Sequence, residues 1–198
     1  MTGFVIAVLA LIGFALLVLV VLYNRFVTLR NRSQNAWAQV DVQLRRRYDL
    51  IPNIVETVRG YATHEREVFE RVTQARAAGI AAQTVEDQAR AENAITSALR
   101  QLFAVAENYP QLRATENFQQ LQAQLQETED QIAVARQIYN DTVLLYNNAI
   151  QTFPGVVVAG SFGFRPRTYL EIEEASRGPV RVDFSRPGPD GSGPPPEA

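Results

Sequence analysis

The chain has 198 residues, a formal net charge of −2 at neutral pH and no cysteine. This length suits one membrane anchor followed by one compact domain of ordinary size. The lack of cysteine excludes disulfides, thiolate metal sites and a cysteine nucleophile. The near balance of charge argues against a nucleic-acid binder with a broad basic surface.

The N-terminal segment from Gly3 to Tyr23, "GFVIAVLALIGFALLVLVVLY", contains no charged residue. About 20 such residues cross the hydrocarbon core of a bilayer as a helix. A cleaved signal peptide would begin with basic residues and end at a small-residue cleavage site, and the sequence has neither. We therefore expect a retained transmembrane anchor over residues 1–24, which contacts the lipid bilayer through residues 3–23.

The flanking charges predict the orientation of this anchor. Arg25, Arg30 and Arg32 follow the segment, and no Lys or Arg precedes it. Basic residues next to a span favour the cytoplasmic side of the membrane. The sequence predicts a single-pass protein of the cell membrane, with its N-terminus outside and its main domain in the cytoplasm.

Beyond the anchor, apolar residues recur at steps of three and four, which is typical of amphipathic helices. No Pro or Gly separates the anchor from the first of them, so the two should form one long helix. Pro52 predicts the end of that helix, because proline lacks an amide donor and clashes with the preceding turn. Asp49 is then expected to cap a second helix that has Pro52 in its first turn and stops at Gly79.

Two further helices are expected in the second half of the chain. Thr84 should cap the third, which ends at Tyr109-Pro110. The fourth spans about residues 118–150, and its sustained three-four spacing is typical of a coiled-coil seam. Next, "VVVAGSFGF" suits an extended piece across the bundle, and the Pro/Gly-rich residues 178–198 are expected to be disordered.

The predicted fold class is therefore all-α. The N-terminal transmembrane helix continues into an antiparallel helical bundle with a long coiled-coil-like hairpin.

The residues that could carry catalysis do not form a known pattern. His64 is the only histidine, and "HEREV" lacks the second histidine of a zinc-protease helix. It also lacks the Glu-x-x-His pairs of a di-iron bundle. A histidine kinase would need an ATP-binding domain for which this chain has no room. We expect no enzyme, no metal and no cofactor, with His64 on the surface.

Arg45, Arg46 and Arg47 form the most basic stretch. On a continuous helix Arg45 lies roughly 30 Å beyond the anchor, much farther than the Debye length of about 8 Å. A lipid-binding patch is therefore disfavoured. Asp41 and Arg45 have the spacing of an ion pair on one helix. An ionic seam, solvated or between helices, is favoured over a site for anionic ligands.

Several charged residues project onto apolar helix faces. Glu65 falls within the stripe of the second helix, and Glu129 and Arg136 fall close to the seam of the fourth. Charges that face a core need partners. Our hypothesis is that these three residues, with Arg47, form buried polar crosslinks that fix helix register. A catalytic carboxylate pair is the alternative.

Two Tyr-Asn pairs, Tyr139-Asn140 and Tyr146-Asn147, lie one heptad apart. We interpret the tyrosines as core residues of the seam, with each asparagine on its adjoining edge. A ligand-binding box is the alternative.

Three long strings resemble the LemA family of bacterial membrane proteins. They are "AWAQVDVQLRRRYDLIPNIVETVRGYATHE", "YPQLRATENFQQLQAQLQETEDQIAVARQIYNDTVLLYNNAIQTFP" and "GSFGFRP". The resemblance covers the chain from Tyr23 to about Glu171. It implies a bacterial inner-membrane protein with one transmembrane helix and a helical bundle over residues 25–177. It implies no reaction or catalytic residue, although family relatives are linked with magnetosome membrane formation and with membrane or envelope maintenance.

The expected function is that of a non-enzymatic, membrane-anchored helical scaffold. It would self-associate as a homo-oligomer or bind another membrane-associated protein, and act in membrane or envelope organisation. The alternative is an accessory or signal-transducing subunit that regulates a membrane hydrolase, a transporter or a sensor system. The structural and interaction candidates are Asp41, Arg47, Asp49, Pro52, Glu65, Glu129, Arg136, Tyr139 and Tyr146.

Overall fold

The computed structural model describes residues 1–172, which are helical throughout apart from turns and an extended C-terminal segment. This confirms the all-α prediction. The helices are α1 (Thr2–Arg59), α2 (Arg66–Ala81), α3 (Val85–Glu107), α4 (Pro110–Arg113), α5 (Glu116–Gln151) and α6 (Gly155–Phe162). The disorder expected for residues 178–198 concerns a part of the chain outside the described residues.

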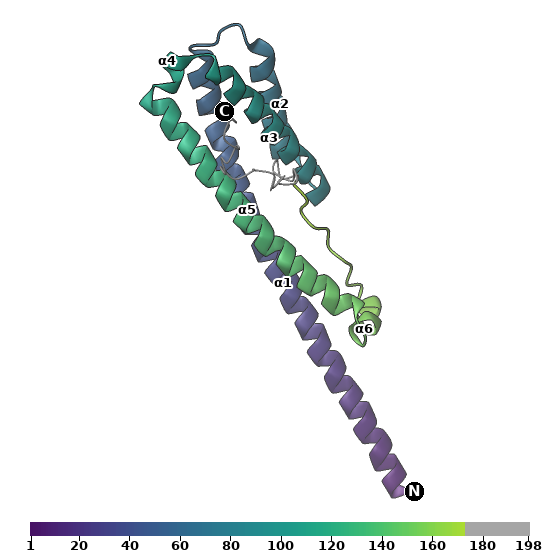
Figure 1. The fold of residues 1–198 in the computed structure, drawn as a ribbon. Helices are drawn as coiled ribbons and strands as arrows, with labels where there is room; N and C mark the ends of the chain where they lie inside the picture. Colours follow the sequence, from purple (N-terminus) through teal and green to yellow (C-terminus); the bar gives the residue numbers. More distant parts are fainter. Residues whose placement is uncertain (173–198) are drawn as a thin grey trace, which may run out of the picture.

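Helix α1 is a continuous rod of 58 residues, about 87 Å long at the rise of an α-helix. Residues 1–17 are exposed and project alone beyond the bundle (Figure 1). Within residues 1–172, α1 is the one helix long and apolar enough to cross a membrane. It runs through the boundary expected at residue 24 without a break, so the anchor and the bundle share one rigid element.

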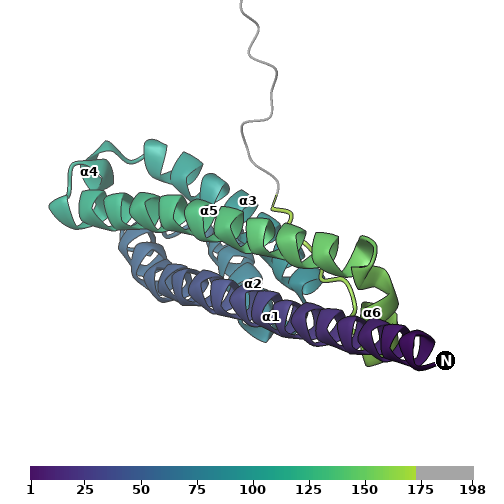
Figure 2. The ribbon, with the colours of Figure 1, turned by 90° about the horizontal axis from the view of Figure 1, so that it is seen from below.

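Helix α5 packs along α1 in the antiparallel direction (Figures 1 and 2). Three pairs of residues follow this register from the membrane-proximal end of the hairpin to its far end. The rings of Trp37 and Tyr139 meet edge to face with centroids 5.1 Å apart, the side chains of Arg47 and Glu129 are 2.8 Å apart, and Asn117 donates to the Thr57 hydroxyl at 3.2 Å. The seam residues of α5 are buried as their spacing predicts: Phe118, Leu121, Leu125, Thr128, Ile132, Ala135, Tyr139, Val143, Tyr146 and Ile150.

Helices α2 and α3 form a hairpin that packs on the end of α1 farther from the N-terminus (Figure 1). The cap predicted for α3 is present, because the Thr84 hydroxyl accepts a hydrogen bond from the Asp87 amide at 3.0 Å. The predicted start of a helix at Pro52 is wrong. Helix α1 continues to Arg59, and the break falls over residues 60–65, where the fully buried Ala62 anchors the turn. Asp49 therefore lies inside α1 and caps nothing.

The structure explains why Pro52 does not end α1. A proline leaves the carbonyl four residues earlier without its helical partner, and this is the carbonyl of Tyr48. Arg76 of α2 donates its Nε–H to that oxygen at 2.7 Å. The contact satisfies a carbonyl that would otherwise lack a partner, and it also fixes α2 against α1.

Replacing Arg76 with methionine should lower the free energy of unfolding by about 1.5–3 kcal/mol, the range for a hydrogen bond to a charged group. In a Pro52→Ala background the amide of Ala at position 52 can donate to the Tyr48 carbonyl. Arg76→Met should therefore lower the free energy of unfolding by at least about 1 kcal/mol less in this background than in the wild type. Urea unfolding of the four proteins in this double-mutant cycle measures the difference. Equal losses in both backgrounds would show that Arg76 does not act through this carbonyl.

The segment "VVVAGSFGF" is not extended as predicted, because residues 155–162 form α6. The valines disfavour a helix only weakly. This preference is outweighed by packing, since the buried Ala159 joins a cluster with Phe26, Leu29, Tyr146 and Ile150 at the base of the bundle. The extended piece comes later, over residues 164–172, and we call it the strap.

Candidate functional site

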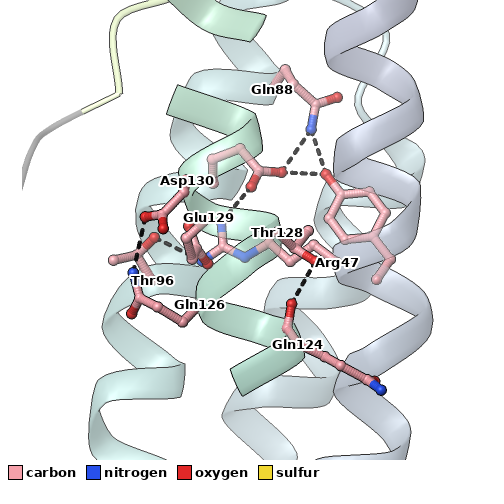
Figure 3. Close-up of polar contacts among 10 residues, drawn as sticks. Arg47, Gln88, Thr96, Gln124, Gln126, Thr128, Glu129 and Asp130 are labelled. Atoms are coloured by element: carbon pink, nitrogen blue, oxygen red, sulfur yellow. Dashed lines mark hydrogen bonds and ion pairs between the residues drawn. The ribbon is translucent and has the colours of Figure 1, made fainter. Parts of the chain in front are cut away.

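The most buried polar cluster lies where α1, α3 and α5 meet (Figure 3). Its centre is Arg47, whose side chain is only 2% exposed. The guanidinium donates to Glu92 at 2.7 Å and to the Thr96 hydroxyl at 2.9 Å, and it forms an ion pair with Glu129 at 2.8 Å. A single arginine therefore connects three helices.

The α3 side of the cluster is built by residues four apart, which share one helix face. Gln88, Glu92 and Thr96 occupy successive turns of that face. Gln88 donates to the Tyr48 hydroxyl at 2.6 Å and to Glu92 at 3.0 Å, and Tyr48 donates to the same Glu92 carboxylate. We call Arg47, Tyr48, Gln88, Glu92, Thr96 and Glu129 the ionic network.

The charges of the ionic network are not balanced, because one arginine faces two carboxyl groups. Glu92 is fully buried, whereas the side chain of Glu129 is 33% exposed. Burial raises the pKa of Glu129 and the Glu92 carboxylate adds to this effect, although Arg47 opposes it. Burial and the adjacent Glu92 also raise the pKa of Tyr48, so this hydroxyl stays protonated and can donate.

The raised pKa of Glu129 predicts a pH dependence of stability. A carboxyl group that holds its proton more tightly in the folded state contributes stability at low pH, and the contribution is lost as pH rises through the raised pKa. The loss should begin near the ordinary value of 4.5. The free energy of unfolding of Glu129→Gln should therefore equal or exceed that of the wild type at pH 7. It should also fall less steeply than that of the wild type as the pH rises from 4.5. Urea unfolding of both proteins from pH 4 upward tests this, and a large loss at pH 7 would contradict it.

The second polar arrangement connects α5 to the strap. The Asn147 side chain accepts from the Arg167 amide and donates to the Arg167 carbonyl, both at 2.9 Å. Asn140 makes the same pair of bonds with Leu170, at 2.9 and 3.2 Å. Each asparagine side chain therefore forms hydrogen bonds with both the N–H and the C=O of one strap residue, as the backbone of a neighbouring β-strand would.

The neighbouring tyrosines bind the same backbone. Tyr146 donates to the Arg165 carbonyl at 3.0 Å and Tyr139 donates to the Thr168 carbonyl at 2.9 Å. One heptad of helix advances about 10.5 Å, and three residues of extended chain advance about 10 Å. This match explains why Tyr-Asn pairs seven residues apart bind a strand at steps of three.

Asn147→Ala should release the strap at Arg167 and lower the free energy of unfolding by about 1–3 kcal/mol, since it removes both bonds and leaves a backbone group unpaired. The direct measurement is hydrogen exchange, in which the Arg167 amide should lose its protection. Asn148→Ala is the matched control, because Asn148 is the exposed neighbour on the same helix. Unchanged protection at Arg167 would contradict the assignment.

The structure brings some of the candidate residues together and separates others. Arg47 and Glu129 meet as the crosslink hypothesis requires, and Arg136 donates to the Ile172 carbonyl at 3.1 Å, so it holds the strap. Glu65 differs from the expectation, because it is half-buried at the start of α2 and forms no salt bridge within residues 1–172. The helix breaks just before it, so it no longer follows the stripe projected from α1.

The remaining candidates lie on the surface. Asp41 pairs with Arg45 at 2.9 Å across one turn of α1, where the Arg45 side chain is largely exposed and the Asp41 side chain is partly exposed. Asp49 and His64 are exposed. Within residues 1–172, no group of three or more His, Asp or Glu side chains is placed to hold a metal ion.

Sequence reasoning missed the α3 half of the ionic network and the strap. A signal was available for α3, since Gln88 and Glu92 interrupt the face that continues as Ile95 and Leu99. The strap had a weaker signal, which is the heptad repeat of Tyr-Asn followed by a segment without helical periodicity.

The fold and these contacts define a class of protein. It is a helical bundle whose long N-terminal helix carries an apolar segment, and whose helices are joined by a buried ionic network and a backbone-bound strap. The LemA family profile matches residues 36–184, and the chain belongs to the LemA family.

Curated relatives of this chain are magnetosome proteins. MamQ 1 and MamQ 2 of Paramagnetospirillum magneticum are each 26% identical in an alignment of length 202, gaps included, that covers 89% of this chain and 74% of the relative. MamQ of Magnetospirillum gryphiswaldense is 25% identical in an alignment of length 201, gaps included, that covers 88% of this chain and 74% of the relative.

Proposed function

We propose that this protein is a non-catalytic, membrane-anchored scaffold that associates with copies of itself. The anchor is residues 3–23 of α1 in a bacterial inner membrane, with the N-terminus outside and the bundle in the cytoplasm. The bundle presents the α1–α5 hairpin to a second copy. The kinship with magnetosome proteins supports a role in organising membranes.

The observation that carries this proposal is an apolar patch on the outer face of the hairpin. Val42 of α1 is 60% exposed, and Val134 and Ile138 of α5 are 55% and 43% exposed. They line a shallow groove of about 400 Å³, whose other lining residues are Ala38, Ala135 and three glutamines, Gln39, Gln43 and Gln131. Removing this apolar surface from water would favour association. A patch on an antiparallel hairpin can also pair with itself around a two-fold axis.

Cysteine crosslinking in native membranes tests this proposal, because the chain has no cysteine of its own. When isolated membranes are treated with a mild oxidant such as copper phenanthroline, Ile138→Cys should give a disulfide-linked dimer at native expression levels. Ile80→Cys is the matched control, since Ile80 is an exposed aliphatic residue of α2 away from the groove. Ile138→Arg, combined with a cysteine at Val134, should abolish the dimer. Failure of crosslinks at both groove positions would refute self-association through this face.

The same strategy tests the topology. A membrane-impermeant maleimide applied to intact cells stripped of their outer membrane should label Thr2→Cys and spare His64→Cys. The reverse pattern would place the bundle outside.

A second candidate function is an accessory or signal-transducing subunit for another membrane protein. It is favoured by the position of the ionic network beneath a groove of about 470 Å³, which Arg47, Glu129 and Phe103 help to line. Unbalanced charges next to a groove can respond to a bound ion or to pH. Crosslinks from Ile138→Cys to one different membrane protein, in place of a second copy, would favour this function.

A further inference from the structure

Helix α6 and the residue pair before it expose an unusual amount of apolar surface. Phe153 is 83% exposed, Val156 47%, Val157 62% and Phe162 50%. The helix, "GVVVAGSF", contains no charged residue. Large exposed side chains gathered in one short segment indicate contact with an apolar partner.

The position of α6 identifies that partner. It packs on α1 just where the apolar segment ends (Figure 1). Its cluster includes Leu22 and Phe26, and Tyr23 meets the Phe162 ring with centroids 5.1 Å apart. Residues 3–23 are long enough to fill the hydrocarbon core, so α6 lies at the depth where the core gives way to headgroups.

The side chains around α6 are those of a membrane interface. Tyr23 and Phe162 meet edge to face, and Phe164 packs edge to face on Tyr23 and on Phe26, with centroids 5.6 and 5.4 Å apart. Aromatic rings favour this depth. The Arg30 guanidinium lies 5.6 Å from the centroid of the Phe164 ring, and the exposed Arg25 and Arg30 can reach lipid phosphates.

We propose that α6 is a second membrane contact, embedded in the cytoplasmic interface with Phe153, Val156, Val157 and Phe162 among the lipids. A bilayer is favoured over a protein partner because the exposed surface continues directly from the transmembrane segment. Because α6 packs on α1, a second membrane contact at α6 would also restrict the tilt of the bundle. The hairpin groove would then be presented at a defined angle to the membrane. This inference rests on the proposed anchoring of residues 3–23.

Depth-dependent fluorescence quenching tests the contact in the full chain. Single cysteines replace Val157 on α6, Val8 in the anchor and Ile80 on α2, and each is labelled with an environment-sensitive dye. Ile80 is a matched aliphatic control, because its neighbour Gly79 packs on Tyr48, about 37 Å along α1 from Tyr23. All three positions are exposed, so labelling should leave the fold intact, and far-UV circular dichroism checks this.

The labelled proteins are reconstituted into vesicles of phosphatidylcholine and phosphatidylglycerol that contain a lipid spin-labelled near the top of its acyl chain. Quenching at residue 157 should be several-fold stronger than at residue 80. Quenching at residue 8 with none at residue 157 would overturn the α6 contact while anchoring stands. A dye at residue 157 whose emission indicates an apolar environment, but which the spin-labelled lipid does not quench, would also overturn it. In that case protein and not lipid would cover α6. No quenching at residue 8 would refute the anchoring, and the α6 contact with it.

Discussion

Replacing Arg47 with methionine should lower the free energy of unfolding by about 3–5 kcal/mol at pH 7. The substitution keeps most of the side-chain volume but removes the cation from the ionic network. Glu92, which is fully buried, would then face Glu129 without an opposing charge. Urea unfolding followed by the fluorescence of Trp37 measures the loss, since this is the only tryptophan and it lies on the α1–α5 seam.

Two further variants make this prediction specific. Arg46→Met removes the adjacent arginine, whose pair with Glu127 is exposed and 3.5 Å long, and it should cost less than about 1 kcal/mol. Arg47→Leu combined with Glu92→Leu and Glu129→Gln removes all three charged groups of the network and should recover most of the stability. A loss at Arg47→Met as small as that at Arg46→Met would show that the network is not a crosslink.

Replacing Gly155 with alanine should detach α6 from the bundle. An added Cβ would lie 2.2 Å from the Ala149 carbonyl oxygen and 3.1 Å from the Phe26 ring. The oxygen belongs to the backbone of α5 and cannot turn away, so the chain must shift. Over-packing of this kind costs about 1–3 kcal/mol or more. Hydrogen exchange should show lost protection over α6, whereas α2 and α3 keep theirs.

Gly160→Ala is the matched control for this prediction. A Cβ at Gly160 meets nothing within 4 Å, and alanine is the better helix former by about 0.5–1 kcal/mol. This variant should therefore keep or increase the protection of α6. Intact protection in Gly155→Ala would mean that α5 and α6 can separate there without cost.

The ionic network lies midway along the α1–α5 hairpin, and Gly155 lies at its base. The ionic network fixes the register of α1 against α3 and α5 in the bundle, whereas Gly155 allows α6 to close on the base of α1. Buried charged groups often give such specificity without net stability. Loss of the network should therefore affect the register of the helices as well as stability.

Signals that depend on neighbours along the chain were sufficient for much of this fold. The sequence was sufficient to predict the apolar run of residues 3–23, the Thr84 cap and the seam of α5. Their physical causes are local, since a helix places residues three and four apart on one face and a cap serves the next turn. The strings shared with the LemA family were legible as well, and the family profile confirms that resemblance.

Only the tertiary structure could decide what distant partners do to each residue. In the sequence Pro52 predicts the end of a helix. The helix continues because Arg76, on another helix, supplies a partner for the Tyr48 carbonyl. Likewise, the sequence shows Arg47 only as part of a basic run, and the structure shows that α3 places Glu92 beside it. The asparagines of α5 gain their role when the strap returns beside them. The sequence by itself determined where helices form and which faces are apolar. The energy of a buried charge or an unpaired carbonyl depends on atoms far away along the chain, so only the folded structure assigns those residues their partners.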